Sequence, residues 1–497
     1  MTSINNPSVQ ILEMDSLSLT NKPRSNTIET STTSASSSPS LSCTTTASSN
    51  PPSLSLSEET TVEAWVAPAS LKSLRTHNPI RAIVDPIVAN SVKCGKERGD
   101  GKDQISLALG DPTAYNNIPP CPTIIQAVSN ALLTPSMAAG YVNACGTPEA
   151  RAAIAKHHDT TDDNVIVANG ASGALELALT ALLDEDSVLL VPRPGFPLYT
   201  VIAESHGASV IHYDLLPQSG WECDLDQVES ILSSHQDATK KVVRGILINN
   251  PSNPTGAVYS REHLVKIARL AARYRIPIVS DEIYGDMTLD GRVFHPMANV
   301  VKGLGGIVPV ITASGIGKQY LVPGWRLGWI VFHDSHHGSI REVKKGAQRL
   351  AQVILGASHL AQVAIPAVLN PSSKQDELAT LAWKEQLHST IQNQAHLLCN
   401  LLNTCHGLEV IQPQGAMYAM VKIYIDKFDE FIVDDVSFMR LLLEEENIVI
   451  LPGRAFGMSG NSCGAHVFRV VFCAPEDVVR VAVGRIFEFC LRHKKCE

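Results

Sequence analysis

The chain of 497 residues is 44% hydrophobic and 18% charged, and its formal net charge is −9. This composition is typical of a globular protein that is long enough for two compact units, or for one large catalytic unit with a smaller domain. Because the sequence has neither a basic run nor about 18 consecutive uncharged apolar residues, we expect no nucleic-acid partner and no membrane span.

The first 62 residues differ in composition from the rest. Ser, Thr, Pro and Ala dominate from Ser31 to Ser57, so this stretch has too little apolar surface to fold. A transit peptide is the alternative, but Glu13, Asp15 and Glu29 do not fit the acid-poor, Arg-rich composition of such peptides. We expect a disordered tail at residues 1–62, with organelle targeting as the less favoured interpretation.

Between residues 160 and 333, short β-branched runs alternate with segments of helical periodicity. This alternation predicts an α/β fold whose mostly parallel, doubly wound sheet has helices on both faces. Helices are expected at 172–183 and 261–275, and strands at 165–168, 188–191, 208–213, 242–248, 276–280 and 307–312.

The pattern changes after residue 341. A long helical stretch at 341–394 is interrupted near Pro366 and Pro371, and strand-like segments follow at 417–424, 448–451 and 467–472. A final amphipathic helix is expected at 475–493, so this part predicts a smaller α+β domain. We expect an N-terminal arm with part of the small domain at 63–110, a large domain at 111–340 and a C-terminal small domain at 341–497.

Ligands of parallel α/β sheets bind beyond the carboxyl ends of the strands, so residues that follow strands are the first candidates. The stretch Asn169–Gly173 follows one strand and opens a helix, where backbone N–H groups predict a phosphate site; an ordinary tight turn is the alternative. The proline-containing loop Asn249–Gly256 follows another strand. Its Asn253 is a candidate to hydrogen-bond a ring substituent, although a plain turn fits equally well.

Two further strand ends carry ionisable groups. An acid such as Asp281 can hold a ring nitrogen protonated, and Tyr284 can donate its hydroxyl; a helix N-cap is the alternative for Asp281. Lys318 follows the strand at 307–312 among small residues, and Arg326 lies one loop further on. Lysine forms a Schiff base with an aldehyde cofactor, and arginine neutralises a phosphate.

These strand ends occur in an order that resembles the fold-type I pyridoxal-phosphate aminotransferases, specifically the tyrosine aminotransferase branch. The resemblance covers residues 71–493. Several separate stretches in one order are more specific than any single motif. The matching stretches are 77–85, 110–113, 193–199, 250–256, 281–287, 322–329 and 468–471.

The resemblance implies pyridoxal 5′-phosphate as the cofactor. Lys318 would bind it covalently and later move the proton at the substrate Cα, Asp281 would pair with the ring nitrogen, and Tyr284 would hydrogen-bond the phenolic oxygen. Arg469 would clamp the substrate α-carboxylate, with Gly110 and Asn253 beside it. The other implied cofactor contacts are Asn253 and Phe196 at the ring, and Gly170, Ala171, Ser172, Ser314 and Arg326 at the phosphate.

Some of these assignments have alternatives. Phe196 also fits simple core packing, and Arg469 fits a solvated surface arginine. Relatives place a phosphate-binding hydroxyl three residues before the lysine, where this chain has Gly315, so Ser314 lies one residue too early. Tyr141 matches a tyrosine that reaches the phosphate of the neighbouring subunit, which implies a homodimer with shared active sites.

Two competing patterns fail. Lys318 does not belong to a P-loop, because Thr312 occupies the first glycine position and Gln319 follows the lysine. His333, His336 and His337 lack the spacing of a metal site and are predicted to form a solvated loop, so no metal is expected.

The resemblance implies a transamination in which an aromatic L-amino acid, foremost L-tyrosine, and 2-oxoglutarate give 4-hydroxyphenylpyruvate and L-glutamate. The alternatives are an aminotransferase of broader specificity, a C–S or β-lyase or a decarboxylase on the same scaffold, and a catalytically silent binding module. Eleven cysteines without a C-x-x-C pair indicate free thiols in a reducing compartment, so a cytoplasmic location is expected. The residue that binds the second carboxylate of the acceptor stays open.

Overall fold

The computed structural model describes residues 67–83, 85–86, 101–134, 138–236, 241–335, 338–458 and 466–495. The predicted tail at 1–62 lies outside the described residues, as does much of the predicted arm at 63–110. In the part that is described, no helix is both long and apolar enough to cross a membrane.

An eight-stranded sheet forms the centre of the larger part of the fold, in the order β2-β9-β8-β7-β6-β3-β4-β5. Its central strands β8, β7, β6, β3 and β4 pair in parallel, whereas β9 and the short β5 pair antiparallel with their neighbours. The predicted mostly parallel sheet is therefore confirmed. The strands are β2 (Val165–Asn169), β3 (Ser187–Arg193), β4 (Ser209–Leu216), β5 (Glu222–Cys223), β6 (Val242–Asn249), β7 (Ile278–Asp281), β8 (Val310–Gly315) and β9 (Leu327–His333).

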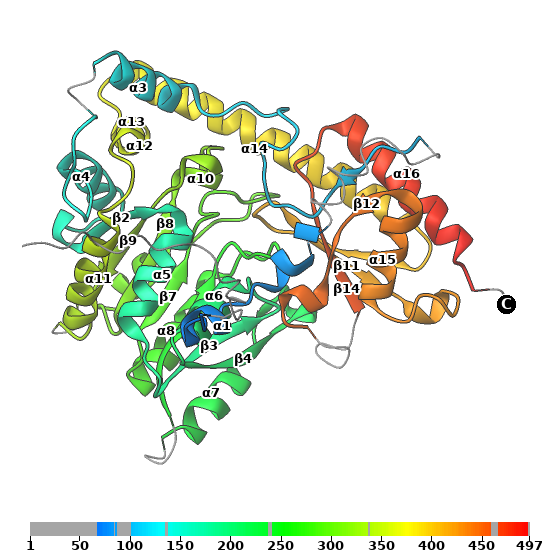
Figure 1. Cartoon of the computed structure of the whole chain (residues 1–497), viewed down its shortest axis with the longest axis horizontal. Helices are drawn as coiled ribbons and strands as arrows, with labels where there is room; N and C mark the ends of the chain where they lie inside the picture. The colour runs from blue at the N-terminus through cyan, green and yellow to red at the C-terminus, as the bar shows by residue number, and fades with distance from the viewer. Residues whose placement is uncertain are drawn as a thin grey trace, which may run out of the picture. The chain divides into compact units, whose positions relative to one another are not determined.

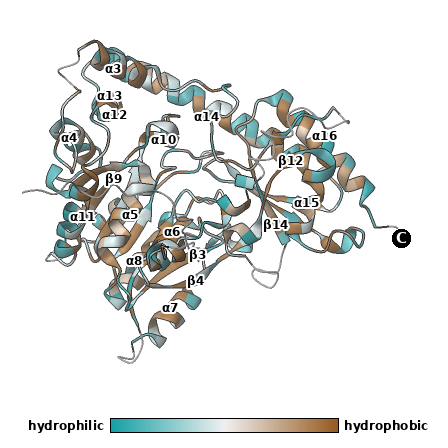
Figure 2. Ribbon diagram, viewed as in Figure 1, coloured by the Kyte–Doolittle hydropathy of each residue, from teal (hydrophilic) through white to brown (hydrophobic). Residues whose placement is uncertain are grey.

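Helices cover both faces of this sheet because successive strand residues point to opposite sides. Val279 and Ile311 pack with residues of α5 (Gly170–Leu182), α6 (Leu198–Ser205) and α11 (Arg341–Ile354). Ile278 and Val310, one residue earlier in each strand, pack with α7 (Leu225–Ser234), α8 (Arg261–Tyr274) and α9 (Met297–Lys302). Figure 2 shows the strands as the hydrophobic interior, with hydrophilic residues on the outer sides of the helices.

A four-stranded antiparallel sheet, in the order β10-β11-β14-β13, forms the smaller part. Its strands are β10 (Leu408–Ile411), β11 (Tyr418–Ile423), β13 (Leu451–Pro452) and β14 (His466–Val471). The helices α15 (Asp435–Glu446) and α16 (Glu476–Arg492) belong to the same region. The larger sheet lies within 111–340 and the smaller one within 341–497, but the exact domain limits stay a prediction.

Two elements join these parts. The 29-residue helix α14 (Lys374–Leu402) contacts α3 (Pro122–Leu133) and α13 (Ala364–Leu369) as well as α16, as Figure 1 shows. The two-residue strand β1 (Ile105–Ser106) pairs in parallel with β12 (Ile448–Val449), which ties the segment before residue 110 to the smaller part. Further α-helices of the described residues are α1 (Leu71–Arg75), α4 (Pro148–His157), α10 (Ile316–Gln319) and α12 (His359–Gln362).

Three predicted boundaries are wrong. The helical stretch at 341–394 breaks at Leu355, which has a left-handed backbone with φ 62, and Pro366 lies inside α13. A proline in the first turn of a helix loses no hydrogen bond, so it does not break the element. The strand expected at 307–312 is β8 at 310–315, and the one expected at 448–451 is divided between β12 and β13, which pair with different strands.

Candidate active site

A cavity of about 340 Å³ lies at the carboxyl ends of β2, β6, β7 and β8. This position agrees with the ligand position expected for a parallel sheet. Residues from both sheets and from the N-terminal segment line it. The predicted site residues that line it are Gly110, Gly170, Ala171, Ser172, Phe196, Asn253, Asp281, Tyr284, Lys318, Arg326 and Arg469.

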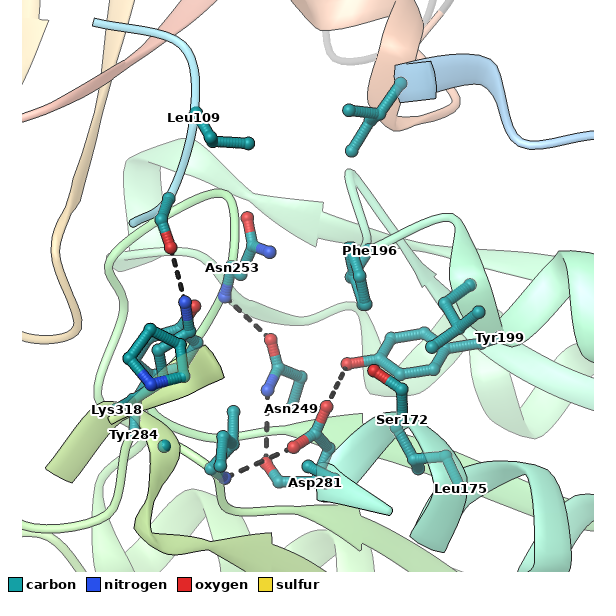
Figure 3. A pocket seen from close by; sticks show the side chains of 18 of the residues that line it. Leu109, Ser172, Leu175, Phe196, Tyr199, Asn249, Asn253, Asp281, Tyr284 and Lys318 are labelled. Atoms are coloured by element: carbon teal, nitrogen blue, oxygen red, sulfur yellow. Dashed lines mark hydrogen bonds between the residues drawn. The ribbon is translucent and has the colours of Figure 1, made fainter. Parts of the chain in front are cut away.

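Lys318 enters the cavity from α10, directly after β8. Its Nζ donates a hydrogen bond to the backbone carbonyl of Gly110, a contact seen in Figure 3. Burial lowers the pKa of Lys318 to about 8, against the opposing effect of Asp111. An amine with this pKa has a neutral fraction near neutral pH, which a nucleophile or a proton carrier requires.

Asp281, the last residue of β7, lies buried at the base of the cavity. Its Oδ2 accepts a 2.7 Å hydrogen bond from the hydroxyl of Tyr199, and its Oδ1 accepts one of 3.2 Å from the backbone N–H of Ile283 (Figure 3). Burial raises the pKa of Asp281 to about 6, while both hydrogen bonds act in the opposite direction. Since no described cation forms an ion pair with this carboxyl, the site fits a ligand that brings a positive charge.

The loop after β6 is held to β7 by Asn249. The Nδ2 of Asn249 donates to the carbonyl of Asp281 over 3.1 Å, and its Oδ1 accepts from the backbone N–H of Asn253 over 2.6 Å. The Oδ1 of Asn253 accepts in turn from Arg469 over 2.7 Å, so its amide NH₂ group is the part left to donate to a ligand.

The N-terminus of α5 has no side-chain cap. Its N-cap residue Asn169 makes no side-chain capping bond, so the first backbone N–H groups of the helix are free to bind a ligand. Arg326 lies beside it and donates from Nη2 to the Asn169 carbonyl over 3.3 Å. Gly170 has φ 74, and a Cβ there would lie 2.7 Å from Nη2 of Arg326, so only glycine allows this approach.

Arg469 lies in β14 on the opposite wall and is 3% exposed. Its guanidinium donates to Asn253 and to the backbone carbonyl of Ala108, while its Nε is buried without a partner. Burial lowers the pKa of Arg469. No carboxylate among the described residues pairs with it, so a carboxylate ligand would supply the missing negative charge. The predicted alternative of a solvated surface arginine is wrong.

Two predicted residues do not line this cavity. Ser314 is 4% exposed, and its hydroxyl donates to the backbone carbonyl of Glu282 over 3.2 Å. It lies in β8, where this bond directs it into the core, so we withdraw it as a phosphate ligand. Tyr141 is 93% exposed and lies outside the cavity lining, so its predicted contact with a partner subunit stays a prediction.

Some lining residues had not been predicted. Tyr199 stood in a matching stretch without a role, and Phe196 packs edge-to-face on it with ring centroids 5.7 Å apart. Asn249 directly follows the predicted strand at 242–248, so its position at a strand end was an available signal. The N-terminal residues Asn78, Ile80 and Arg81 also line the cavity; they lie in the matching stretch 77–85, but no role had been predicted for them. Tyr418 lines it as well, and no predicted stretch marks it as a site residue.

A buried lysine of lowered pKa, a buried acid without a cation, an uncapped helix N-terminus and an arginine without a carboxylate partner fit an enzyme site for an anionic aldehyde cofactor and a carboxylate substrate. The chain belongs to the aminotransferase class I and II family, whose model matches residues 102–486. Enzymes of this family depend on pyridoxal phosphate, so the chain is a pyridoxal-phosphate-dependent aminotransferase.

Among curated proteins, the chain is 37% identical over 449 residues to the tyrosine aminotransferase of Dictyostelium discoideum, covering 88% of this chain and 100% of that protein. It is 36% identical to the tyrosine aminotransferase of Homo sapiens, covering 87% of this chain and 89% of the relative. Among solved structures, the tyrosine aminotransferase from Leishmania infantum matches with a TM-score of 0.76 and 29% identity, covering 87% of this chain and 100% of that one. These relatives are aminotransferases, so the lyase and the silent binding module are not favoured.

Proposed function

We propose that this chain transfers the amino group of an aromatic L-amino acid, foremost L-tyrosine, to 2-oxoglutarate. The products are the aromatic 2-oxo acid, 4-hydroxyphenylpyruvate for tyrosine, and L-glutamate. The observation that carries the proposal is the convergence of Lys318, Asp281, Arg326 and Arg469 on one cavity of about 340 Å³. The similarity to tyrosine aminotransferases over most of the chain supports the choice of substrate.

We propose that the cofactor is held at three places. Gly170, Ala171 and Ser172 at the N-terminus of α5, with Arg326, bind its phosphate through backbone N–H groups and a permanent positive charge. Asp281 keeps the ring nitrogen protonated, and Tyr199 holds the Asp281 carboxylate in place. Asn253 and Tyr284 hydrogen-bond the phenolic oxygen, and Phe196 covers a ring face. Two observations support binding: the N-terminus of α5 has no side-chain cap, and Asp281 has no cation partner among the described residues.

Pyridoxal phosphate supplies an aldehyde that condenses with amines and a cationic ring that takes up the electron pair of the substrate Cα. Arg469 binds the substrate α-carboxylate, which fixes the Cα–H bond in the orientation required for its cleavage. Lys318 would hold the cofactor through its Nζ, and as a free amine it would move the proton at the substrate Cα. The lowered pKa of Lys318 supports this role, because a general base is most effective near the working pH.

We also propose a homodimer in which Tyr141 of one subunit reaches the phosphate in the other. In support, Tyr141 is 93% exposed and the apolar Val353 and Leu355 at the end of α11 are 80% and 59% exposed. A cytoplasmic location is proposed as well. It is supported by seven described cysteines that are all free thiols: Cys121, Cys145, Cys223, Cys399, Cys405, Cys473 and Cys490.

The test uses the purified protein with pyridoxal phosphate, L-tyrosine and 2-oxoglutarate. We expect L-glutamate and the aromatic 2-oxo acid to appear in equal amounts, and a panel of amino-acid donors against 2-oxoglutarate then ranks the side chains. Borohydride reduction followed by peptide mapping should label Lys318. Lys302, which is exposed and pairs with Asp159, is the matched control lysine and should stay unlabelled. An absence of amino transfer to any 2-oxo acid would contradict the proposal.

A further inference from the structure

Tyr418, the first residue of β11, is a lining residue without an assigned role. Its hydroxyl oxygen lies 2.5 Å from the hydroxyl oxygen of Tyr284, and the two rings meet edge-to-face with centroids 5.6 Å apart. Tyr418 belongs to the smaller sheet and Tyr284 lies in the turn after β7, and both side chains are buried, Tyr418 at 2% exposure and Tyr284 at 3%. The hydrogen bond holds the two hydroxyl groups together, and either oxygen can be its donor.

The ring of Tyr418 contacts a second part of the site. The Cζ atom of Arg469 lies 4.3 Å from the ring centroid, within the range of a cation–π interaction. Both residues belong to paired strands, because Met420 in β11 is opposite Arg469 in β14. The ring therefore supports the guanidinium that is proposed to bind the substrate carboxylate.

The hydroxyl of Tyr418 also abuts Gly110, whose carbonyl accepts the hydrogen bond from Lys318. A Cβ on residue 110 would clash with this hydroxyl. Tyr418 thus contacts Tyr284, Arg469 and Gly110, and Gly110 is the hydrogen-bond partner of Lys318.

A count of protons sets the direction of the Tyr284–Tyr418 bond. A tyrosine hydroxyl has one proton to donate and lone pairs to accept. Burial raises the pKa of both tyrosines, so both keep their protons near neutral pH. If Tyr284 donates its proton to the phenolic oxygen of the cofactor, Tyr418 must be the donor in the 2.5 Å bond.

We propose that Tyr418 is a positioning residue whose hydroxyl donates to Tyr284 and thereby directs the Tyr284 proton to the cofactor oxygen, while its ring supports Arg469. The inference rests on the proposed role of Tyr284 in the proposed function. A hydroxyl that accepts a hydrogen bond is a stronger donor itself, so Tyr418 strengthens the bond from Tyr284 to the cofactor.

The hydroxyl and the ring make separable contributions. Tyr418→Phe removes the hydroxyl and keeps the ring under Arg469, whereas Tyr418→Leu removes both. Without the Tyr418 donor, the Tyr284 bond withdraws less negative charge from the cofactor oxygen. A more negative cofactor oxygen would favour a proton on Nζ of Lys318, so the pH midpoint of the visible absorbance of the holoenzyme should rise.

The experiment compares wild type, Tyr418→Phe, Tyr284→Phe and the double variant by pH titration of this absorbance and by equilibrium binding of pyridoxal phosphate to the apoenzyme. We expect Tyr418→Phe to raise the midpoint and to weaken cofactor binding by about threefold to tenfold, the effect of one hydrogen bond. Tyr284→Phe should show a larger shift in the same direction. The double variant should match Tyr284→Phe alone, because the Tyr418 hydroxyl acts through Tyr284.

Two further variants complete the test. Tyr213→Phe is the matched control, since Tyr213 is a buried tyrosine whose hydroxyl donates to the Leu247 carbonyl and which does not line the cavity; it should leave the midpoint unchanged. In steady-state kinetics, Tyr418→Leu should raise KM for L-tyrosine, whereas Tyr418→Phe should lower kcat with little change in KM. If Tyr418 had only a structural role, the two variants would not affect kcat and KM separately in this way.

The outcomes separate this inference from the proposed function. A wild-type protein that binds no pyridoxal phosphate would overturn both. A functional wild type with an unshifted midpoint in Tyr418→Phe, or with additive shifts in the double variant, would overturn the role of Tyr418 alone.

Discussion

The phenolic hydroxyl of Tyr199 donates a 2.7 Å hydrogen bond to Oδ2 of Asp281, and both side chains are buried beneath the cavity. Burial alone would favour the neutral acid, and the Tyr199 bond opposes this by lowering the pKa of Asp281. The tyrosine therefore helps to keep a negative charge where the proposed ring cation needs one.

Tyr199→Phe should consequently raise the pKa of Asp281 and weaken cofactor binding most strongly below neutral pH. The wild-type pKa is about 6, so the fraction of Asp281 that is ionised near pH 6 to 7 falls when the pKa rises. We expect a loss of about threefold to tenfold in affinity at neutral pH. The measurement is binding of pyridoxal phosphate to the apoenzyme as a function of pH, with Tyr213→Phe as the control. If wild type and Tyr199→Phe bind pyridoxal phosphate with equal affinity at every pH measured, the prediction is contradicted.

Lys318→Met should stabilise the apoenzyme at neutral pH. The pKa of Lys318 is about 8 in the folded chain and 10.5 for a lysine that is fully exposed to water, so between these values the unfolded chain binds more protons and the wild-type free energy of unfolding rises with pH. Below pH 8 the buried amine destabilises the fold by up to about 3 kcal/mol, partly offset by its bond to Gly110.

Urea unfolding of the apoenzyme at several pH values measures this difference. The advantage of Lys318→Met over wild type should be greatest below pH 8 and should shrink as the pH approaches 10.5. Lys302→Met at the exposed Lys302 serves as the control and should show no such trend. A difference between variant and wild type that is independent of pH would show that the amine is not destabilised by burial.

The sequence could predict those site residues whose position depends only on the strand that precedes them. Asp281 directly follows one apolar run and Lys318 comes shortly after another, and the carboxyl ends of parallel strands lie at one edge of the sheet, so their proximity was predictable. Tyr418 and Arg81 could not be found this way. Tyr418 reaches the cavity because β11 pairs with β14, and Arg81 because a segment remote in sequence contributes to the cavity lining.

Errors in the sequence interpretation have a similar physical origin. Ser314 was inferred from its distance along the chain to Lys318, but in a strand a shift of one residue reverses the direction of the side chain. The strands β1 and β5 have two residues each, which is too short for a periodic signal, and they exist because neighbouring backbone pairs with them. Local patterns thus predict the central sheet and miss elements that depend on tertiary contacts.

Arg469→Lys should weaken substrate binding and slow turnover together. Arg469 divides its donors between Asn253 and Ala108, and lysine lacks the planar geometry to keep these bonds and also bind a carboxylate by two parallel ones. A charge-assisted hydrogen bond contributes about 1.5–3 kcal/mol, so kcat/KM should fall by about tenfold to a hundredfold for the amino acid and for the oxo acid alike. Arg440→Lys in an exposed ion pair with Glu444 is the control. A decrease of kcat/KM for only one of the two substrates would contradict the proposal that Arg469 binds the α-carboxylate of both.

Arg81 is the candidate to bind the second carboxylate of 2-oxoglutarate. Of the cations that line the cavity, Lys318, Arg326 and Arg469 have proposed roles, which leaves Arg81. Its side chain is 63% exposed and its ion pair with Asp85 is 3.4 Å long, so little free energy is lost when it turns to a ligand. The Oδ1 of Asn78 accepts hydrogen bonds from the backbone N–H groups of Ile80 and Arg81, and these bonds order the segment.

Arg81→Gln should therefore raise KM for 2-oxoglutarate by about threefold to tenfold, the range of an exposed charge-assisted contact. The KM for L-tyrosine and for a monocarboxylic acceptor such as pyruvate should change little, because neither carries a second carboxylate. Added salt should weaken 2-oxoglutarate binding in wild type more than in the variant, since mobile ions screen an exposed charge pair. Steady-state kinetics with both acceptors at two salt concentrations measure these effects. Equal changes in KM for 2-oxoglutarate and pyruvate would contradict the prediction, because they would show that Arg81 affects the entry of any substrate into the cavity.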